Sequence, residues 1–342
     1  MKIGTCVNFS EIDGMEKKFA QLREHNFDSC QLVSWNPAAW TDENANTLKT
    51  LLEQYQITVS AFWCGWTGPA AWNFYDGPLT LGLVPVEYRQ MRIENLCDGA
   101  DFAHKLGITD VVTHMGFIPE NPYDPNFSSF CIAVRTVAEH LKKNGQCLLF
   151  ETGQETPVTM LRCFEAVGTD NLYVNLDTAN LILYGKANPA DALDVFGKYV
   201  RNLHAKDGCY PTNGHELGAE TPIGQGKVDF RAVFTKLHEL GYNSYVTIER
   251  EIDGPQQLTD ILERVPEDET PLVVLFDGVT DVRNFGAIAR SAECAGAHGL
   301  ITPLKNSAPV NAEAIRSSAG ALTAIPVCRV GSIRNTVKLL QT

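Results

Sequence analysis

Eight short runs of strand-forming residues, separated by amphipathic segments, constrain this chain more than any other feature. We predict strands at residues 2–8, 29–33, 58–63, 110–114, 147–151, 172–177, 200–206 and 244–249. The segments between them, such as EKKFAQLREH and VEYRQMRIENLCDGADFAHKLG, place apolar residues at three- and four-residue steps, as helices that cover a sheet do. Gly107 and Gly241 stand where a helix end favours a left-handed residue.

Repeated strand–helix units limit the fold to a few architectures. Eight such units are what a (β/α)₈ barrel requires, because eight parallel strands close the sheet and leave no edge. An open, doubly wound sheet is the alternative, but its first turn is usually rich in glycine, and TCVNFSEIDG contains no G-x-G-x-x-G. With 342 residues the chain has room for a barrel and a smaller second domain. We therefore predict an α/β barrel over residues 1–262 and a second segment over 263–342, with PEDET near the boundary.

Composition limits where the protein can be located and which kinds of partner it can bind. The sequence holds no run of about 18 apolar residues, so we predict no membrane span. The N-terminus MKIGTCVNF is typical of a first strand and not of a signal peptide. Ten scattered cysteines without a C-x-x-C pair indicate reduced thiols and a cytoplasmic location. A formal net charge of −13 disfavours broad binding to nucleic acid, because phosphate contacts need Lys and Arg.

Ionisable residues end the later predicted strands, where a barrel places its catalytic groups. Glu151 ends LLFETG, Asp177 lies in VNLDTAN, His204 in NLHAKDG and Glu249 in VTIERE. Three carboxylates are unfavourable in a partly buried pocket unless a cation neutralises them. Oxygen-rich ligation with one imidazole suits Mn²⁺ or Mg²⁺, with Co²⁺ or Zn²⁺ as alternatives. Each residue alone could be a hydrogen-bonded strand end, but their convergence predicts a metal site.

Further polar residues near these strand ends allow two interpretations. His114, at the end of the fourth predicted strand, is a candidate to bind a sugar hydroxyl or a satisfied core histidine. Lys206 either stabilises negative charge on a substrate or pairs with Asp207. Three loop residues, Glu155, His215 and Glu216, are expected to face solvent.

Aromatic residues crowd the segment FWCGWTGPAAWNFYDGP after the third predicted strand. Trp63, Trp66, Trp72 and Phe74 lie here, and Trp35 follows the second strand. Such rings either stack on sugar C–H surfaces and exclude water, or pack only against one another. Trp63 is therefore a candidate substrate-binding residue.

Residues 1 to about 262 resemble the xylose-isomerase-like TIM barrels, the sugar phosphate isomerase/epimerase family, through FETG, NLDTAN, LHAKD and IERE. PIGQGKVDF is similar to the glycine-containing segment before the last helix of that family. The resemblance implies that Glu151, Asp177, His204 and Glu249 bind one divalent ion and that the two glutamates flank the substrate. Asn180 is a departure, because several members have His there, and we keep it as a substrate-binding candidate.

The resemblance implies proton transfer on a small-molecule carbohydrate, a sugar or a sugar phosphate, through an enediolate. Glu151 and Glu249 are the predicted acid/base pair as well as metal ligands. Return of the proton to the same carbon with inversion is epimerisation, and return to the adjacent carbon is isomerisation. A polyol dehydratase uses the same proton abstraction and is the nearer alternative. An endonuclease acting at abasic DNA is disfavoured by the charge, and a binding module without catalysis stays open. Barrels of this kind often pair, so a homo-oligomer is one expectation.

Residues 263–342 resemble a different family. FDGVTDVRNFGAIARSAECAGAHGL and SSAGAL are similar to motifs of the SpoU-type RNA ribose 2′-O-methyltransferases, whose fold is a knotted α/β domain. The resemblance implies roles in catalysis and RNA binding for Asn284 and Arg290. The motifs that form the S-adenosylmethionine pocket and the knot do not follow in this sequence. We therefore expect an incomplete, knot-lacking segment of a fusion that binds no S-adenosylmethionine, transfers no methyl group, and engages RNA only if completed.

Overall fold

The computed structural model describes residues 1–251, 261–262, 265–266, 269–304, 306–330 and 332–341. The chain divides into two compact units, residues 1–251 (unit 1) and 252–342 (unit 2). The predicted boundary between residues 262 and 263 lies at the edge of residues 263–264, which are outside the described part. That boundary stays a prediction.

Unit 1 is a closed barrel of parallel strands in the order β1-β10-β7-β6-β5-β4-β3-β2. These strands are β1 (Lys2–Asn8), β2 (Ser29–Ser34), β3 (Thr58–Cys64), β4 (Asp110–Thr113), β5 (Cys147–Glu151), β6 (Leu172–Asp177), β7 (Val200–Ala205) and β10 (Tyr245–Ile248). The predicted barrel is confirmed, and all eight strands lie within about a residue of their predicted bounds.

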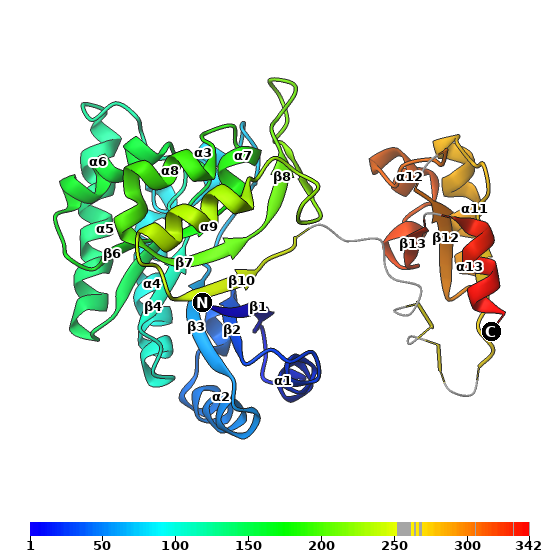
Figure 1. The fold of residues 1–342 in the computed structure, drawn as a ribbon, viewed down its shortest axis with the longest axis horizontal. Helices are drawn as coiled ribbons and strands as arrows, with labels where there is room; N and C mark the ends of the chain where they lie inside the picture. The colour runs from blue at the N-terminus through cyan, green and yellow to red at the C-terminus, as the bar shows by residue number, and fades with distance from the viewer. Residues whose placement is uncertain (252–260, 263–264, 267–268, 305, 331, 342) are drawn as a thin grey trace. The chain divides into compact units, whose positions relative to one another are not determined.

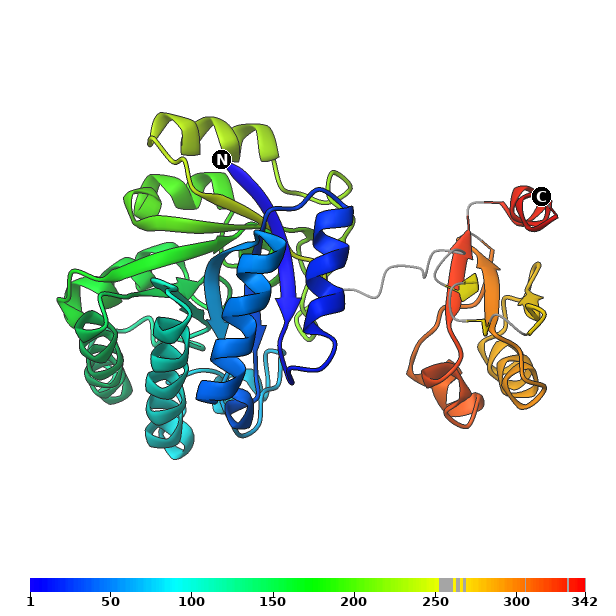
Figure 2. The ribbon, with the colours of Figure 1, turned by 90° about the horizontal axis from the view of Figure 1, so that it is seen from below.

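Helices cover the outer face of the barrel (Figures 1 and 2). They are α1 (Met15–Glu24), α2 (Asp42–Tyr55), α4 (Val86–Lys105), α5 (Pro125–Lys143), α6 (Pro157–Val167), α8 (Pro189–Phe196) and α9 (Phe230–Glu239), with the turns η1 (Pro37–Ala39) and η2 (Gly197–Tyr199). Helix α5 shows why they form: the Asp124 carboxylate caps its start by accepting from Asn126 N, and a proline fits the first turn. Its buried Phe130, Val134 and Leu141 then recur at helical spacing and pack on the sheet.

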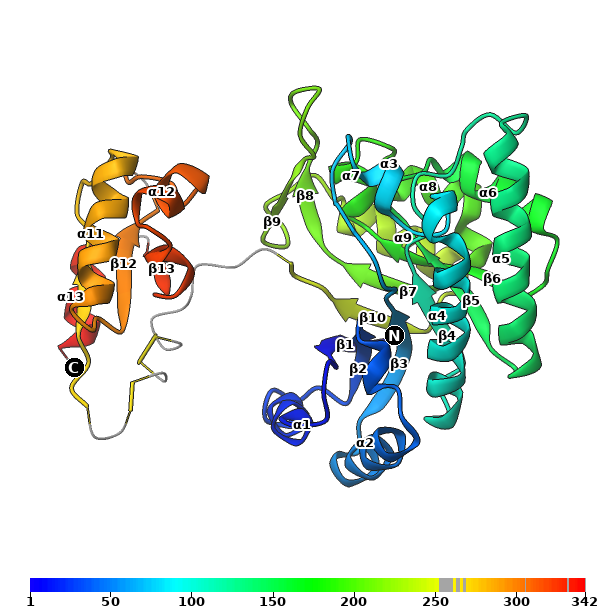
Figure 3. The same cartoon turned by 180° about the vertical axis from the view of Figure 1, so that it is seen from behind.

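Short elements gather at the C-terminal end of the barrel strands, where Figures 1 and 3 place them together. These are α3 (Gly77–Thr80), α7 (Asn180–Leu183), β8 (Asp207–Cys209) and β9 (Ala219–Thr221). The Asp207 carboxylate orders the segment after them by accepting N–H groups from Gly208, Gly224, Gly226 and Val228 at 2.8–3.1 Å. A Cβ at Gly226 would lie 2.1 Å from Asp207 Oδ1, so glycine is required there.

Unit 2 is a parallel sheet in the order β11-β12-β13 with helices around it. Its elements are β11 (Val273–Leu275), α11 (Val282–Cys294), β12 (Gly299–Pro303), α12 (Ala312–Ser317), η3 (Ala321–Thr323), β13 (Val327–Val330) and α13 (Ile333–Leu340). Phe276, Phe285 and Leu300 form its core, and the close approach of α11 to α12 leaves no room for a side chain at Gly286. The predicted α/β segment is confirmed. Over the residues described, none of the helices combines the length and apolar character of a membrane span.

Candidate metal centre

Four side chains at the C-terminal ends of neighbouring strands each bring one ligand atom within 4.8 Å of the others. Glu151 ends β5, Asp177 ends β6, His204 lies in β7, and Glu249 directly follows β10. These strands are consecutive in the barrel, and Asp177 is in register with His204. The sheet thus brings together all four of the predicted ligands.

The imidazole of His204 is at the centre of this group and fully buried. Its Nδ1 lies 3.2 Å from Glu249 Oε2, 3.4 Å from Glu151 Oε1 and 3.7 Å from Asp177 Oδ2. Its Nε2 donates to Gln31 Oε1 at 2.7 Å, which directs Nδ1 at the carboxylates. Burial alone would lower the pKa of His204, but the charges of Glu249 and Glu151 outweigh it and raise the pKa well above its usual value. A cation binding here would displace that proton.

Gln31 is a functional neighbour that the sequence reasoning missed. Its side chain is buried on β2, in the run SCQLVS. An amide inside a strand of a closed barrel needs a polar partner, and that is the signal that could have found it.

The surroundings of the Asp177 carboxylate best test whether this site fits a metal ion. Its Oδ1 accepts backbone N–H groups from Ala179 at 2.8 Å and Asn180 at 2.7 Å. Its Oδ2 is buried and has no hydrogen-bond partner within the described part of the chain. Burial raises the pKa of Asp177 to about 6, although the Lys206 charge opposes the rise. An oxygen ligand left without a partner beside three further donors fits a divalent ion.

Three of the predicted substrate-binding residues contact Glu151 instead of standing apart from it. The indole Nε1 of Trp63 donates to Glu151 Oε2, and Asn180 Nδ2 donates to Oε1 at 3.2 Å. His114 Nε2 lies 3.3 Å from the same Oε1. Burial would raise the pKa of Glu151, but the charges of His114 and His204 outweigh it and lower the pKa to about 2. Glu151 is therefore a fixed, ionised carboxylate at neutral pH.

Lys206 supplies a buried positive charge that the sequence argument did not count. Its Nζ lies 3.2 Å from Glu249 Oε2 and 3.7 Å from Asp177 Oδ2, donates to Asn180 Oδ1 at 3.3 Å, and pairs with the Glu251 carboxylate. Burial would lower the pKa of Lys206, but these carboxylates, Glu249 first, raise it well above its usual value. Part of the negative charge is thus balanced within the protein.

One of the two interpretations of Lys206 needs correction, and one partner of Lys206 was missed. The expected pair with Asp207 is wrong, because backbone N–H groups occupy the Asp207 oxygens. Glu251 was not foreseen, although the two-residue step in IERE is that of residues on one side of a strand.

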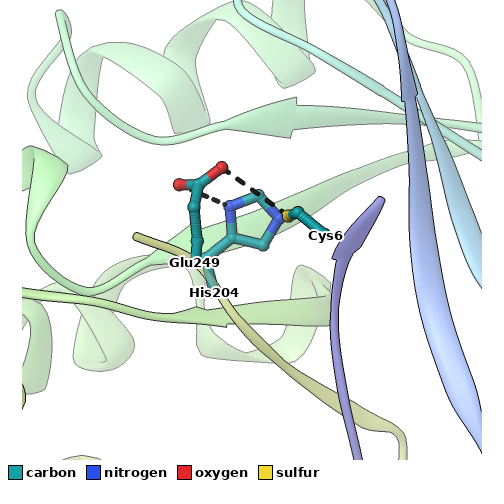
Figure 4. A group of neighbouring side chains, drawn as sticks. All are labelled: Cys6, His204 and Glu249. Atoms are coloured by element: carbon teal, nitrogen blue, oxygen red, sulfur yellow. Dashed lines mark hydrogen bonds and ion pairs between the residues drawn. The ribbon is translucent and has the colours of Figure 1, made fainter. Parts of the chain in front are cut away.

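Cys6 on β1 forms a second possible ligand group with His204 and Glu249. Figure 4 shows these three side chains pointing toward one another. The Cys6 thiol donates to Glu249 Oε1 at 3.8 Å. Burial, and then the Glu249 charge, raise the pKa of Cys6 well above its usual value. For Glu249 burial acts against ionisation, but His204 and Lys206 outweigh it and lower the pKa well below its usual value. Sequence reasoning missed Cys6, which lies on the strand beside β10.

The predicted aromatic residues form a cluster next to this site. The ring of Trp35 lies 4.9 Å from that of Trp63, 5.1 Å from Trp66 and 6.4 Å from Trp72. The Trp72 ring is also 5.0 Å from that of His114. The rings pack against one another, and two of the residues in contact here, Trp63 and His114, also contact Glu151. Stacking of these rings on a sugar stays a prediction.

The buried side chain of Arg92 holds the loop segments next to this aromatic cluster. Its guanidinium donates to the carbonyl oxygens of Gly82 at 2.7 Å and Pro69 at 2.8 Å, and lies 5.2 Å from the Trp66 ring. A buried arginine that satisfies carbonyl groups of the loop orders it with charge-assisted hydrogen bonds.

The loop residues did not all behave as expected. His215 and Glu216 are exposed, as predicted. The expectation for Glu155 is wrong, because its side chain is only 2% exposed on the loop between β5 and α6. Burial raises the pKa of Glu155 to about 7. In unit 2 both Asn284 and Arg290 are exposed on α11.

Comparison with known proteins assigns unit 1 to a family. The model of the xylose isomerase-like TIM barrel family matches residues 19–268, and the chain belongs to this family. A xylose isomerase domain protein from Planctomyces limnophilus is 31% identical, with a TM-score of 0.68 over 73% of this chain and 91% of that one. An L-ribulose 3-epimerase is 20% identical, with a TM-score of 0.57 over 74% and 82%. A barrel from Mycobacterium smegmatis in complex with magnesium is 21% identical, with a TM-score of 0.55 over 71% and 84%. The last two likenesses show the fold.

A second family model, that of the SpoU rRNA methylases, matches residues 271–342. The 23S rRNA (guanosine-2′-O-)-methyltransferase RlmB of Photorhabdus laumondii is 44% identical over 84 residues, which are 25% of this chain and 33% of that protein. The same enzyme of Escherichia coli is 38% identical over 85 residues, 25% of this chain and 35% of that protein. The chain thus spans about a third of the length of these curated relatives.

Proposed function

We propose that unit 1 is a divalent-metal-dependent sugar isomerase or epimerase that moves a proton through an enediolate. The convergence of Glu151, Asp177, His204 and Glu249, with the buried Asp177 Oδ2 atom accepting no hydrogen bond within the described residues, carries the proposal. Family membership supports it, and the epimerases among the structural neighbours agree with it. The four residues would hold the ion, which when bound would make the C–H group beside a ketose carbonyl more acidic. Mn²⁺ or Mg²⁺ suits these ligands best.

The protein's own residues would carry the proton. Glu151 and Glu249 both contact His204 Nδ1 and are ionised, so one can remove a proton from the substrate carbon. The carboxyl group formed in that step, or the other carboxylate after it has taken a proton from solvent, can then return a proton to the substrate. Trp63 and Asn180 hold the Glu151 oxygens in place. The Lys206 ammonium, next to Glu249, would balance negative charge as the enediolate forms.

Solvent-deuterium exchange tests this function directly. The full chain is analysed for bound metal and then incubated with ketoses in D₂O, and deuterium at the substrate carbon is followed by mass spectrometry. We expect exchange in the wild type and a loss of about 100-fold or more in Glu151→Gln and Glu249→Gln. Exchange at the wild-type rate in both variants would contradict the proposal. Exchange accompanied by loss of water would indicate the polyol dehydratase instead.

We infer a second role, directed at RNA, for residues 271–342. The family match and the exposure of Asn284 and Arg290 on α11 support it. Methyl transfer to ribosomal RNA is the activity of the relatives, and it is a proposal for this chain. Calorimetric titration of the full chain with S-adenosylmethionine, followed by a methyl-transfer assay on RNA, tests it. Binding and transfer would support this role, whereas absence of both would support the expectation from the sequence that the segment is inactive.

A further inference from the structure

A second group of buried polar side chains lies beside the metal ligands, and binding of a metal ion would not give its hydrogen-bonding atoms partners. It comprises His114, Gln154, Glu155 and Tyr184, each at most 6% exposed, and we name it the second polar cluster. His114 follows β4, Gln154 and Glu155 lie between β5 and α6, and Tyr184 follows α7. Strands β4, β5 and β6, with α7 after β6, are consecutive in the barrel, so the segments that follow them meet at its C-terminal end. The four buried side chains therefore lie in one region of the fold, and the pKa influences that link Glu155 with His114 and Tyr184 with Gln154 agree with this.

The hydrogen-bonding atoms of this cluster lack partners. In the part of the chain that the structure describes, no hydrogen bond reaches His114 Nδ1, either amide atom of Gln154, Glu155 Oε1 or the Tyr184 hydroxyl. The Tyr184 hydroxyl approaches the Gln154 amide, but without hydrogen-bond geometry. Buried polar groups almost always have partners, because an unmade bond leaves their full desolvation cost uncompensated. Five such atoms in one region point to a polar ligand.

The second polar cluster is directly connected to the proposed metal centre. The Nε2 atom of His114 contacts Glu151 Oε1 at 3.3 Å, while Nδ1 on the other side of the ring is without a partner. A Cβ at Gly153 would lie 3.4 Å from the His114 ring and 3.6 Å from Asn180 Cβ, so the backbone at Gly153 lies close to both of these side chains. A molecule that reacts at Glu151 is thus one imidazole width from the unpartnered Nδ1 atom of His114.

The chemistry of the unpaired atoms matches hydroxyl groups. The Gln154 amide both donates and accepts, as do a hydroxyl and a protonated carboxyl group. Because burial raises the pKa of Glu155 to about 7, much of this carboxyl group is protonated near neutral pH. A phosphate dianion would instead need unpaired cations. Here Lys206 is held by Glu249 and Glu251, and His114 by Glu151. Lys186, whose charge acts on Glu155, pairs with Glu120 at 3.9 Å.

We propose that His114, Gln154, Glu155 and Tyr184 form a subsite for the hydroxyl groups of an uncharged, non-phosphorylated ketose. This inference rests on the proposed isomerase or epimerase function and names its substrate class. The metal ligands would engage the reacting end of the sugar, and the second polar cluster would bind hydroxyls that do not react. The exclusion of phosphate esters follows from the buried carboxyl group and the lack of an uncommitted cation among these contacts.

The test compares binding and exchange in the full chain with Mn²⁺ present. Free D-fructose and D-tagatose are titrated by calorimetry and assayed for deuterium exchange, beside their terminal phosphate esters. We expect kcat/KM for the free sugars to exceed that for the esters about tenfold or more. In Gln154→Leu, KM should rise about tenfold with little change in kcat, because bonds to non-reacting hydroxyls act equally in the ground and transition states. Tyr184→Phe should raise KM less, since it removes one hydroxyl.

Control variants separate a binding role from a structural one. Glu165→Gln changes an exposed carboxylate on α6 and should leave KM unchanged. Glu155→Gln keeps a neutral donor and acceptor, so its KM should rise less than that of Glu155→Leu. Mn²⁺ affinity and melting temperature are measured for each variant, and we expect Mn²⁺ affinity to stay within about twofold of the wild type in Gln154→Leu, which changes no metal ligand.

The outcomes distinguish this inference from the function on which it rests. Ketose binding that weakens in Gln154→Leu, without exchange in the wild type, would support the subsite and contradict the isomerase or epimerase function. Exchange that is equal in the wild type, Gln154→Leu and Tyr184→Phe would support the function and overturn the subsite. Preference for the phosphate esters, or no binding of free ketoses, would also overturn the subsite.

Discussion

The two units of this chain differ in buried charge: unit 1 buries several charged side chains, and the described part of unit 2 buries none. Unit 1 buries the acids Glu151, Asp177 and Glu155 and the base Lys206 around one end of its barrel. In the described part of unit 2, no acidic or basic side chain is buried, and the buried polar residues are Thr302, Ser318 and Thr336. Burying a charge costs stability unless partners compensate it. The site of unit 1 is therefore built into the fold, whereas the candidate residues of unit 2 lie on its surface.

The comparison also shows where a fold can hold unfavourable groups. Asp177 and His204 sit on adjacent strands of a closed barrel, so the sheet itself fixes their separation. Asn284 and Arg290 lie on the exposed side of helix α11 in unit 2, whose sheet has only the three strands β11, β12 and β13 among the described residues. Function in unit 1 should depend on buried ligands, and function in unit 2 should depend on a binding partner that covers α11.

The largest expected difference between the units is in metal binding. Asp177→Ala should weaken Mn²⁺ binding about 100-fold or more, because it removes a predicted ligand whose buried Oδ2 atom accepts no hydrogen bond within the described residues. Calorimetry measures the affinity. Saturating Mn²⁺ should also stabilise wild-type unit 1 by about 2.7 kcal/mol at 100 times Kd, and this gain should be lost in the variant.

Arg290→Ala in unit 2 is the matched control for that prediction. It changes an exposed residue of α11 and should leave Mn²⁺ affinity within about twofold of the wild type. Equal Mn²⁺ affinity in Asp177→Ala and the wild type would contradict the assignment of the metal site.

The next effect concerns the pH dependence of unit 1. Burial raises the pKa of Glu155 from 4.5 to about 7, so the folded state holds this proton more tightly than the unfolded chain. Stability should therefore fall as the pH rises from about 4.5 to about 7, and stay reduced above that range. Glu155→Gln removes the ionisation and should stabilise the metal-free protein by about 3 kcal/mol at pH 8, with little gain at pH 4.5.

Melting temperatures at the two pH values, with Glu165→Gln as the exposed control, measure this effect. A gain that is the same at both values would show that the Glu155 carboxyl group does not titrate as its burial implies. A pH-dependent gain in the exposed control would show that the effect is not specific to the buried position.

The sequence predicted the barrel and the four converging residues because both follow from local patterns. Strand periodicity defines the eight strands, and parallel strands place their last residues at one end. Residues that depend on tertiary contacts were harder to find. Glu155 was expected in solvent because loops are usually exposed, yet its side chain is buried. Gln31 contacts His204 across 173 positions of sequence, and no local pattern encodes such a contact.

A smaller effect compares one aspartate in each unit. Asp207 accepts N–H groups from four backbone positions, so Asp207→Ala should destabilise unit 1 by about 3 kcal/mol. Asp281 caps α11 through one bond to Asn284 N at 2.8 Å, so Asp281→Ala should cost unit 2 about 1 kcal/mol. Hydrogen exchange in the full chain reports each unit separately. A larger loss of protection for Asp281→Ala than for Asp207→Ala would reverse the comparison.

The smallest effect concerns cysteine reactivity and leaves stability unchanged. None of the ten cysteines, all of which the structure describes, forms a disulfide, and Cys294 on α11 of unit 2 is the exposed one. Cys6 is half-buried beside Glu249, and burial with that negative charge raises the pKa of its thiol, so the reactive thiolate is scarce at neutral pH. Iodoacetamide should therefore label Cys294 about tenfold faster or more, as measured by peptide mass spectrometry. Cys294→Ser should remove the fast phase, whereas labelling of Cys6 at an equal rate would show that the Glu249 carboxylate does not suppress its ionisation.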